Sequence, residues 1–495
     1  MSPHQLRLLR HPQMKRPMAP SASTSRSKMP STQKSVRNWA TLVPPVKTVV
    51  AAIVATVDVE AATVAAESVS AVSVNDADIE RTELASGVRV ITERMPEARS
   101  VSVGMWFAVG SRDEPASIAG ASHFLEHLLF KGTEERSARS IATAVDAVGG
   151  EMNAYTSREH TAYYLRLPVS ELQAGVELLA DVVSAPAFRP VELDAEREVI
   201  IEELLMSEDT PDDLVLTSLY ESLYPEHPLG RETLGDHDTV AAMTRDDVVS
   251  FHAQWYRPSN LVVAAAGALE HQQVVDALGP LFVGTESGAA PSRNAPEAHL
   301  QALVQIDRPI EQVHVAIGWR GLPLADEDRY ARWVANHVLG GGMSSRLFQE
   351  IRESRGLAYS VFSSPSSYSD AGSLIVYAGT ALARLEELLA VTDEVLATFL
   401  ADGITEEEHA VALGYLEGSM LLGLEDSGSR MARLGTGLVT RNDITSIDEH
   451  VRRIRAVTTE EVHSVIRRVL GSPRAVSAVG PLGKGSAALE RFACG

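Results

Sequence analysis

Cysteine is almost absent from this sequence, since Cys494 is the single one among 495 residues. One thiol excludes an internal disulfide framework and also a zinc site built from cysteine thiolates. Long hydrophobic runs are scarce as well. The run from Thr48 to Val57 has ten residues, too few for a helix that spans a bilayer, and no stretch after residue 80 resembles a membrane span. We therefore expect no membrane-spanning helix.

Acidic residues are missing from the first 57 positions, which contain nine Lys and Arg; the first acid is Asp58. Because the whole chain carries a formal net charge of -22, the remaining 438 residues carry 31 net negative charges. Such a body is a poor match for nucleic acid and favours cationic partners such as basic peptides. The alternative is that this charge serves only solubility.

The N-terminal region differs in composition from the rest of the chain. Residues 1–47 are rich in Ser, Pro, Arg and Lys and show no hydrophobic periodicity. A basic, acid-free leader is typical of a mitochondrial transit peptide, and a basic region before an apolar run is typical of a secretory signal. The basic part is too long for an ordinary signal, and its prolines interrupt an amphipathic helix. We predict that residues 1–75 are a disordered extension or result from a start site assigned too far upstream. A targeting signal is the alternative.

The main candidate for a functional site is an H-x-x-E-H pattern formed by His123, Glu126 and His127. The segment between Gly120 and Gly132 contains no helix breaker, and its Phe and Leu residues supply an apolar face, so we predict a buried helix of about three turns. Residues three and four apart share one side of a helix. Two neutral imidazoles on one side can hold a zinc ion, and a neighbouring carboxylate can take a proton from water.

A chance match is the alternative for this pentapeptide, because the chain has 15 His and motif matches carry a false-positive risk. A single His on an apolar helix is more often a core residue with satisfied hydrogen bonds than a metal ligand. Burying two His and one Glu together without partners is costly, however. This cost favours a metal site.

The chain from about residue 79 onward is a tandem repeat. VHVAIGW, which starts at Val313, lies 212 positions after VSVGMWF, and TTEEVHSVI, which starts at Thr458, lies 214 positions after TRDDVVSFH. This near-constant offset indicates the duplication of a whole domain. Strands are mixed with helices without strict alternation, which predicts two α+β units built of layers rather than a doubly wound parallel sheet.

The second copy of the repeat acts as a control for the motif. A shift of 214 positions takes His123 to His337, but the positions that match Glu126 and His127 are Gly340 and Gly341. Only one metal site per chain is therefore expected.

A third metal ligand is needed, because two imidazoles alone make a weak zinc site. The predicted helix from Val191 to Leu205 carries Glu196 and Glu203, which are seven residues apart and hence nearly on one face, whereas Glu202 points away from Glu196. A solvated acidic stripe is the alternative interpretation of this pair.

At this point the chain resembles the pitrilysin/insulinase zinc peptidases, in the branch of the mitochondrial processing peptidases and their short bacterial relatives. The resemblance covers residues 79 to about 482 and rests on motifs in the family's order and spacing. These motifs are HFLEHLLFKGT at 123–133, GGEMNAYTSREHTAYY at 149–164, EREVIIEEL at 196–204 and GGGMSSRLFQEIRESRGLAYSV at 340–361. The long N-terminal extension and a short glycine loop depart from the processing subunits and are nearer to the bacterial members.

The resemblance implies a ligand set and a catalytic group. His123, His127 and Glu203 would bind one Zn2+ per chain, Glu126 would be the general base, and Glu196 would support the site by orienting His127. The chain would then be a zinc metalloendopeptidase of the inverted H-x-x-E-H type that hydrolyses peptides or unfolded segments.

The resemblance also implies substrate contacts. The strand after the double glycine would lay its edge along the substrate backbone, which implicates Asn153 and Ala154, and Arg352 and Tyr359 from the second half would reach the substrate and its carbonyl. Taken alone, the last two would be an ordinary surface charge and a packed aromatic.

The implied architecture is two homologous α/β-layer domains. We expect an N-terminal zinc-binding domain at 76–283, a linker at 284–298, an inactive homologous domain at 299–484 and a tail at 485–495. The family resemblance implies a clamshell of two chains, a homodimer or a heterodimer, and the bacterial-type spacing favours a cytoplasmic enzyme over the mitochondrial matrix. The rivals are a structural subunit and a non-catalytic partner that presents substrate, and the complete ligand set argues against both.

Overall fold

The computed structural model describes residues 78–282 and 288–494. The extension predicted for residues 1–75 lies outside the described residues, as does the part of the predicted linker at 284–287. Each half of the described chain contains one mixed sheet: six strands in the order β1-β2-β6-β3-β5-β4, and five strands in the order β7-β11-β8-β10-β9. The predicted fold of two α+β units is confirmed.

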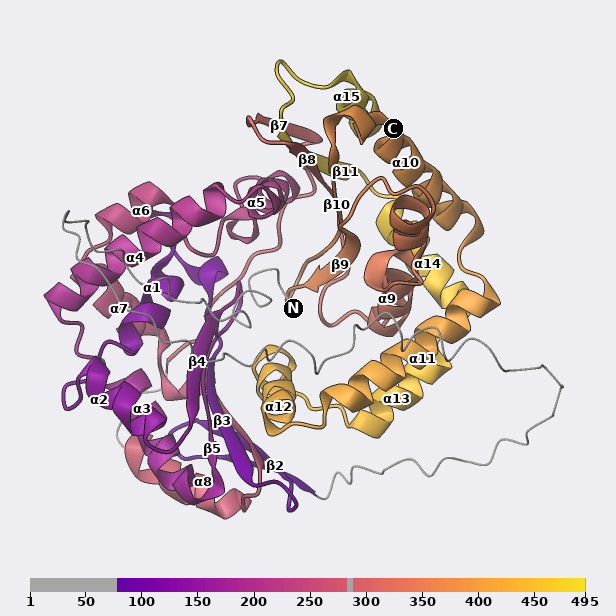
Figure 1. Cartoon of the computed structure of the whole chain (residues 1–495). Helices are drawn as coiled ribbons and strands as arrows, with labels where there is room; N and C mark the ends of the chain where they lie inside the picture. The colour runs from indigo at the N-terminus through magenta and orange to yellow at the C-terminus, as the bar shows by residue number, and fades with distance from the viewer. Residues whose placement is uncertain (1–77, 283–287, 495) are drawn as a thin grey trace, which may run out of the picture. The chain divides into compact units, whose positions relative to one another are not determined.

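The first sheet begins with a hairpin formed by its first two strands. Its strands are β1 (Ile79–Glu83), β2 (Arg89–Arg94), β3 (Ser100–Phe107), β4 (Glu151–Thr156), β5 (Thr161–Pro168) and β6 (Leu261–Gly267). The helices of this half are α1 (Ala121–Leu129), α2 (Ala138–Asp146), α3 (Leu172–Ser184), α4 (Pro190–Glu208), α5 (Pro211–Leu223), α6 (His237–Ala242), α7 (Arg245–Trp255) and α8 (His271–Leu278). Figure 1 shows α1 and α3 on one side of strands β3, β4 and β5.

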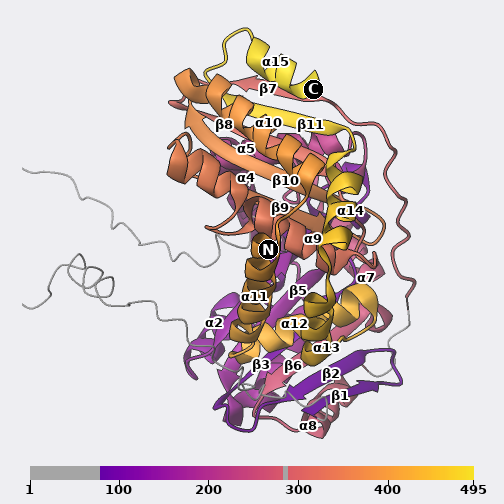
Figure 2. The same cartoon turned by 90° about the vertical axis from the view of Figure 1, so that its right-hand side faces the viewer.

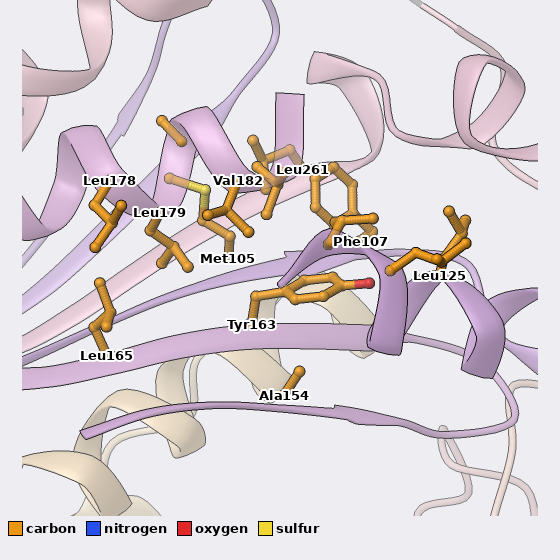
Figure 3. Packing of buried hydrophobic residues seen from close by; sticks show 14 of the residues in the cluster. Met105, Phe107, Leu125, Ala154, Tyr163, Leu165, Leu178, Leu179, Val182 and Leu261 are labelled. Carbon is orange, nitrogen blue, oxygen red and sulfur yellow. The ribbon is translucent and has the colours of Figure 1, made fainter. Parts of the chain in front are cut away.

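Both faces of the first sheet are buried. Side chains alternate along a strand, so Val103, Met105 and Phe107 of β3 enter the core under the helices of the same half, whereas Trp106 enters a second cluster on the opposite face. In the first core, Leu125 of α1 lies near the aromatic rings of the sheet, as Figure 3 shows. The helix with the H-x-x-E-H pattern therefore sits on a rigid base.

The second half repeats this plan. Its strands are β7 (Leu303–Asp307), β8 (Gln312–Arg320), β9 (Val361–Ser367), β10 (Gly372–Ala381) and β11 (Arg474–Gly480). Its helices are α9 (Arg329–Asn336), α10 (Leu385–Asp402), α11 (Glu406–Gly423), α12 (Ser427–Arg441), α13 (Ile447–Ala456), α14 (Thr459–Leu470) and α15 (Ala487–Cys494). Within the segment expected as a tail, α15 packs beside β7 and β11 and buries Leu489 and Phe492 in the second core (Figure 2).

The remaining face of each sheet is covered by a helix from the other half. Helix α12 packs on β3 and β6, and its Gly435 lies against the indole of Trp106. In return, α5 packs on β8 and β11, where Leu219 and Leu223 lie against Gly318. The two helices begin 216 residues apart, so they occupy equivalent places in the repeat. The two halves thus exchange equivalent helices.

An ion pair accompanies the exchange on the first sheet. Glu93 of β2 is completely buried, and its carboxylate accepts hydrogen bonds from Arg430 and, at 3.1 Å, from Arg433 of α12. A buried charge is tolerable only with such partners. The pairing therefore makes the position of α12 specific, whereas apolar packing alone would allow it to slide.

Candidate metal centre

The position directly before helix α1 suits only glycine. Gly120 has a left-handed backbone with φ of +95°, and a Cβ there would lie 2.5 Å from the carbonyl oxygen of Leu234. The helix then buries Phe124 and Leu125 completely. Burial of these residues leaves His123 and His127 on the side of α1 that approaches α4.

Three predicted ligands come together between α1 and α4. Glu203 Oε2 lies 3.6 Å from Nε2 of His123 and 3.5 Å from Nε2 of His127. One ligand atom from each of the three residues lies within 4.8 Å of the others. Two imidazoles and one carboxylate are a common donor set for zinc in enzymes that keep a coordination position open. The residues therefore fit a zinc ion.

The second ring nitrogen of His127 is held by Glu196. Its Nδ1 donates to Glu196 Oε2 at 3.0 Å, and Lys131 Nζ lies 2.6 Å from the other oxygen of that carboxylate. Glu196 and Glu203 are seven residues apart on α4 and share one face, as the helical spacing predicts, and both approach His127. A carboxylate on Nδ1 leaves Nε2 as the metal-binding nitrogen.

Sequence reasoning missed Lys131. Its only signal is that it follows His127 by four positions, which is helical spacing, but α1 ends at Leu129 and the contact goes to a residue of another helix. Burial raises the pKa of Glu196, and the hydrogen bonds from His127 and Lys131 outweigh this effect and lower it. Glu196 therefore stays ionised beside the ligand that it holds.

The field at the site favours a cation. Burial by itself lowers the pKa of His127, but the bonds to Glu196 and Glu203 and the charges of Glu203 and Glu126 together raise it to about 9. The surrounding acids thus stabilise positive charge where the imidazoles meet. A divalent cation would be stabilised by the same field.

Glu126 lies one residue before His127 and is half-buried. Its charge, after burial and the neighbouring Tyr256, contributes to a pKa of Tyr163 well above the ordinary value. The hydroxyl groups of Tyr163 and Tyr256 lie 2.9 Å apart, and both tyrosines stay neutral beside this carboxylate. Glu126 therefore borders the sheet on one side and the ligand cluster on the other.

Strand β4 forms the edge of the first sheet. It pairs with β5 on one side only, so one row of its backbone groups is open to an added strand. Asn153 uses its Oδ1 to accept the amide hydrogen of Ala154 at 2.8 Å, and the Ala154 side chain is buried. The edge position agrees with the expected substrate strand, whose role stays a prediction.

The other two predicted substrate residues form a pair in the second half. Arg352 donates from Nη1 to the backbone oxygen of Tyr359 at 3.0 Å, and its guanidinium lies 4.6 Å from the Tyr359 ring centroid. The Tyr359 side chain is 81% exposed. A ring so exposed is available for contact with a ligand, and its role also stays a prediction.

Comparison with known proteins agrees with this fold. Residues 89–237 match the family described as "Insulinase (Peptidase family M16)", and residues 242–414 match the "Peptidase M16 inactive domain". The chain belongs to peptidase family M16. Within this M16 protein, the ligand cluster lies in the first matched region and the glycines that replace Glu126 and His127 lie in the region whose description contains the word inactive.

Relatives of this M16 chain occur in several bacteria. An uncharacterized zinc protease of Mycobacterium tuberculosis is 44% identical over 408 residues, covering 81% of this chain and 93% of the relative. An uncharacterized zinc protease of Bacillus subtilis is 38% identical over 405 residues, covering 82% of this chain and 99% of the relative. These bacterial sources give no support to the mitochondrial alternative.

Solved structures share the fold of this M16 chain. A protease from Helicobacter pylori superposes with a TM-score of 0.76 at 24% identity, covering 81% of this chain and 99% of that one. An M16-like peptidase from Alicyclobacillus acidocaldarius gives 0.72 at 21% identity, with 81% and 97% covered. Among the described residues of this protein, no helix has the length and apolar character to cross a bilayer.

Proposed function

We propose that this protein is a zinc metalloendopeptidase that hydrolyses peptide bonds in peptides or unfolded segments, with one zinc ion per chain. The observation that carries the proposal is the approach of ligand atoms from His123, His127 and Glu203 to within 4.8 Å of one another. Membership of family M16 and the zinc-protease names of the relatives support it.

The ligand residues supply a preorganised site. Zinc held by His123, His127 and Glu203 would act as a Lewis acid and would lower the pKa of a water to about 7. Glu196 fixes the orientation of the His127 ring through Nδ1, and Lys131 balances the charge of Glu196. The ligands therefore need little rearrangement, which keeps catalytic geometry within narrow limits.

Glu126 is the proposed general base. Its carboxylate takes a proton from the attacking water and later gives that proton to the nitrogen of the leaving amine, so the proton count balances. Tyr163 and Tyr256 lie beside Glu126 and are neutral, so their hydroxyl groups add no second negative charge next to its carboxylate.

The edge of β4 is the proposed binding strand for the substrate. An extended peptide that adds to an exposed edge is held by main-chain hydrogen bonds, which tolerate many sequences. A substrate carbonyl would replace Asn153 Oδ1 as the acceptor for the Ala154 amide. Arg352 and Tyr359 would contact the peptide and its carbonyl from the second half, and the acidic body favours basic peptides.

The rival roles are a structural subunit and a partner that presents substrate without cleaving it. Neither role needs three converging ligands backed by Glu196 and Lys131. We expect the active assembly to be a homodimer, with a heterodimer as the alternative. Cleavage by the purified single chain would favour the homodimer.

The decisive experiment compares the wild type with Glu126→Gln. Zinc content is measured in both proteins, and cleavage of a basic peptide with a quenched fluorophore is measured with and without chelator. We expect one zinc per chain in both proteins, cleavage by the wild type that chelator abolishes, and a rate at least about 100-fold lower in the variant. Activity surviving in Glu126→Gln would refute the role of Glu126. Zinc in both proteins with cleavage in neither would favour the presenting-partner role.

Helix α4 offers a matched control for the third ligand. Glu202 and Glu203 are adjacent acids, but only Glu203 approaches the histidines. Glu203→Gln should weaken zinc binding strongly, whereas Glu202→Gln should leave it unchanged. Equal zinc affinity in the two variants would remove Glu203 from the ligand set.

A further inference from the structure

A buried acid stands at the N-terminus of α1. Glu114 is 4% exposed, and its two oxygens accept from the backbone amides of Gly120 and Ser122, each at 2.7 Å. Arg231 donates from Nη2 to the backbone oxygen of Glu114 at 2.8 Å. These two amides belong to the first turn of α1, where backbone donors have no partner within the helix. Glu114 therefore ties the loop before the helix to the first turn of the helix.

The other side of this turn is closed by backbone. A Cβ on Gly235, whose φ is +83°, would lie 2.4 Å from the carbonyl oxygen of Ala119, and Gly120 has the equally close approach to Leu234 described above. The start of α1 is thus enclosed by the 234–235 segment and by the carboxylate of Glu114. His123 follows Ser122 directly, so the residues that Glu114 and the 234–235 segment enclose are adjacent to the first proposed ligand.

Capping a helix with the buried carboxylate of Glu114 costs free energy. Burial raises the pKa of Glu114 to about 7, although the hydrogen bonds from the two backbone amides and the charge of Arg231 lower it. A neutral Ser or Asn at the cap position would satisfy a backbone donor without burying a charge. A single side chain that spans two amides, however, restrains the first turn at two points. This restraint is what a capping hydroxyl on its own does not provide.

We propose that Glu114 is a positioning residue that fixes the first turn of α1 and thereby places His123 and Glu126 for metal binding and proton transfer. Glu114 acts on these residues through the amides of Gly120 and Ser122. This inference rests on the proposed function, because the position of α1 matters for catalysis only if the helix carries the metal ligands and the general base.

The test uses the full chain with Glu114→Ala and Glu114→Gln. Two quantities are measured: amide hydrogen exchange of residues 120–129 in the metal-free protein, and zinc affinity by competition with a chromophoric chelator. We expect faster exchange in residues 120–129 and a zinc Kd raised about 10-fold in Glu114→Ala, as for other residues that orient ligands. Glu114→Gln keeps one acceptor oxygen and should show a smaller effect in the same direction.

Asp426 provides a matched control in the second half. Its carboxylate also accepts from two backbone amides at a helix start, those of Gly428 and Ser429 on α12. Asp426→Ala removes an equivalent cap, so we expect it to change neither exchange in residues 120–129 nor zinc affinity. A zinc Kd raised equally by Asp426→Ala and Glu114→Ala would reduce Glu114 to a general stabiliser and overturn the inference.

The remaining outcomes separate this inference from the proposed function. Unchanged exchange of residues 120–129 or unchanged zinc affinity in both Glu114 variants overturns the inference. If Glu114→Ala fails to fold, Glu114→Gln decides by the same two measurements. A wild type that binds no zinc defeats the proposed function instead, and exchange in the metal-free variants still shows whether Glu114 holds α1.

Discussion

Equivalent positions in the two halves have opposite environments. In the first half, His123 meets His127 and Glu203 in one cluster. In the second half, His337 occupies the matching place but stacks on Tyr415 of α11, with 4.1 Å between ring centroids. Within the described residues, neither ring nitrogen of His337 has a hydrogen-bond partner, and burial lowers its pKa. The same scaffold thus holds a candidate metal site in one half and a neutral packed ring in the other.

The glycines of the second half explain part of this difference. Gly340 and Gly341 stand at the positions that match Glu126 and His127, and a Cβ on Gly342 would lie 2.8 Å from the His337 ring. The chain there packs backbone against the imidazole where the first half places side chains. A duplicated fold therefore preserves layers and helix order, while a few side chains decide whether the shared position can bind a metal.

The largest expected contrast between the halves is in metal content. His127→Ala removes a ligand, so we expect loss of stoichiometric zinc, whereas His337→Ala at the equivalent of His123 should keep it. Metal analysis of the two purified variants makes the comparison. Retained zinc in His127→Ala would remove His127 from the ligand set, and lost zinc in His337→Ala would show that the second half takes part in binding.

The next contrast concerns the exchanged helices. Glu93→Ala leaves Arg430 and Arg433 without the buried carboxylate that they bond, so we expect a loss of about 3–5 kcal/mol in the free energy of unfolding. Urea denaturation measures the loss, and Glu83→Ala on the exposed side of β1 is the control. A cost below about 1 kcal/mol would mean that packing alone seats α12.

The dependence of stability on pH should be shared by both halves. Burial lowers the pKa of His252 to about 4, and burial with Arg441 and other arginines lowers that of His450 to about 4. Between the ordinary pKa of 6.5 and 4, the unfolded chain binds protons that the native chain does not. The free energy of unfolding should therefore fall as pH falls through this window.

Urea denaturation at pH 7 and pH 5 tests this expectation. His252→Gln and His450→Gln should each make the decrease shallower than in the wild type. A decrease equally steep in both variants would show that other groups, such as paired carboxylates, control acid stability.

The smallest contrast compares close packing at the two exchange contacts. A Cβ on Gly435 would lie 2.4 Å from the rigid indole of Trp106, whereas one on Gly318 would lie 2.8 Å from the methyl end of Leu223. Leu223 can shift, so Gly435→Ala should destabilise by roughly 1–2 kcal/mol and Gly318→Ala by less. Thermal unfolding of both variants provides the measurement, and the reverse order would mean that α5 is seated more tightly than α12.

Local patterns predicted much of the fold. The buried helix at 121–129 was readable because helix periodicity is a property of adjacent residues, and the repeat was readable as a near-constant offset along the chain. Helical spacing likewise predicted that Glu196 and Glu203 share one face of α4, and the family resemblance implied that this face meets His127. The exchange of α5 and α12 was not readable, because an apolar helix face does not say which sheet it will cover.

The sequence by itself determined which residues form the candidate site. The spacing of the H-x-x-E-H pattern and the seven-residue step on α4 select one side of each helix, whatever the surroundings. Tertiary structure alone decided what supports them: Glu114 reaches across six and eight positions to the start of α1, and Lys131 reaches a carboxylate on another helix. Such contacts depend on how loops and helices pack, and packing is set by the whole core rather than by neighbours along the chain.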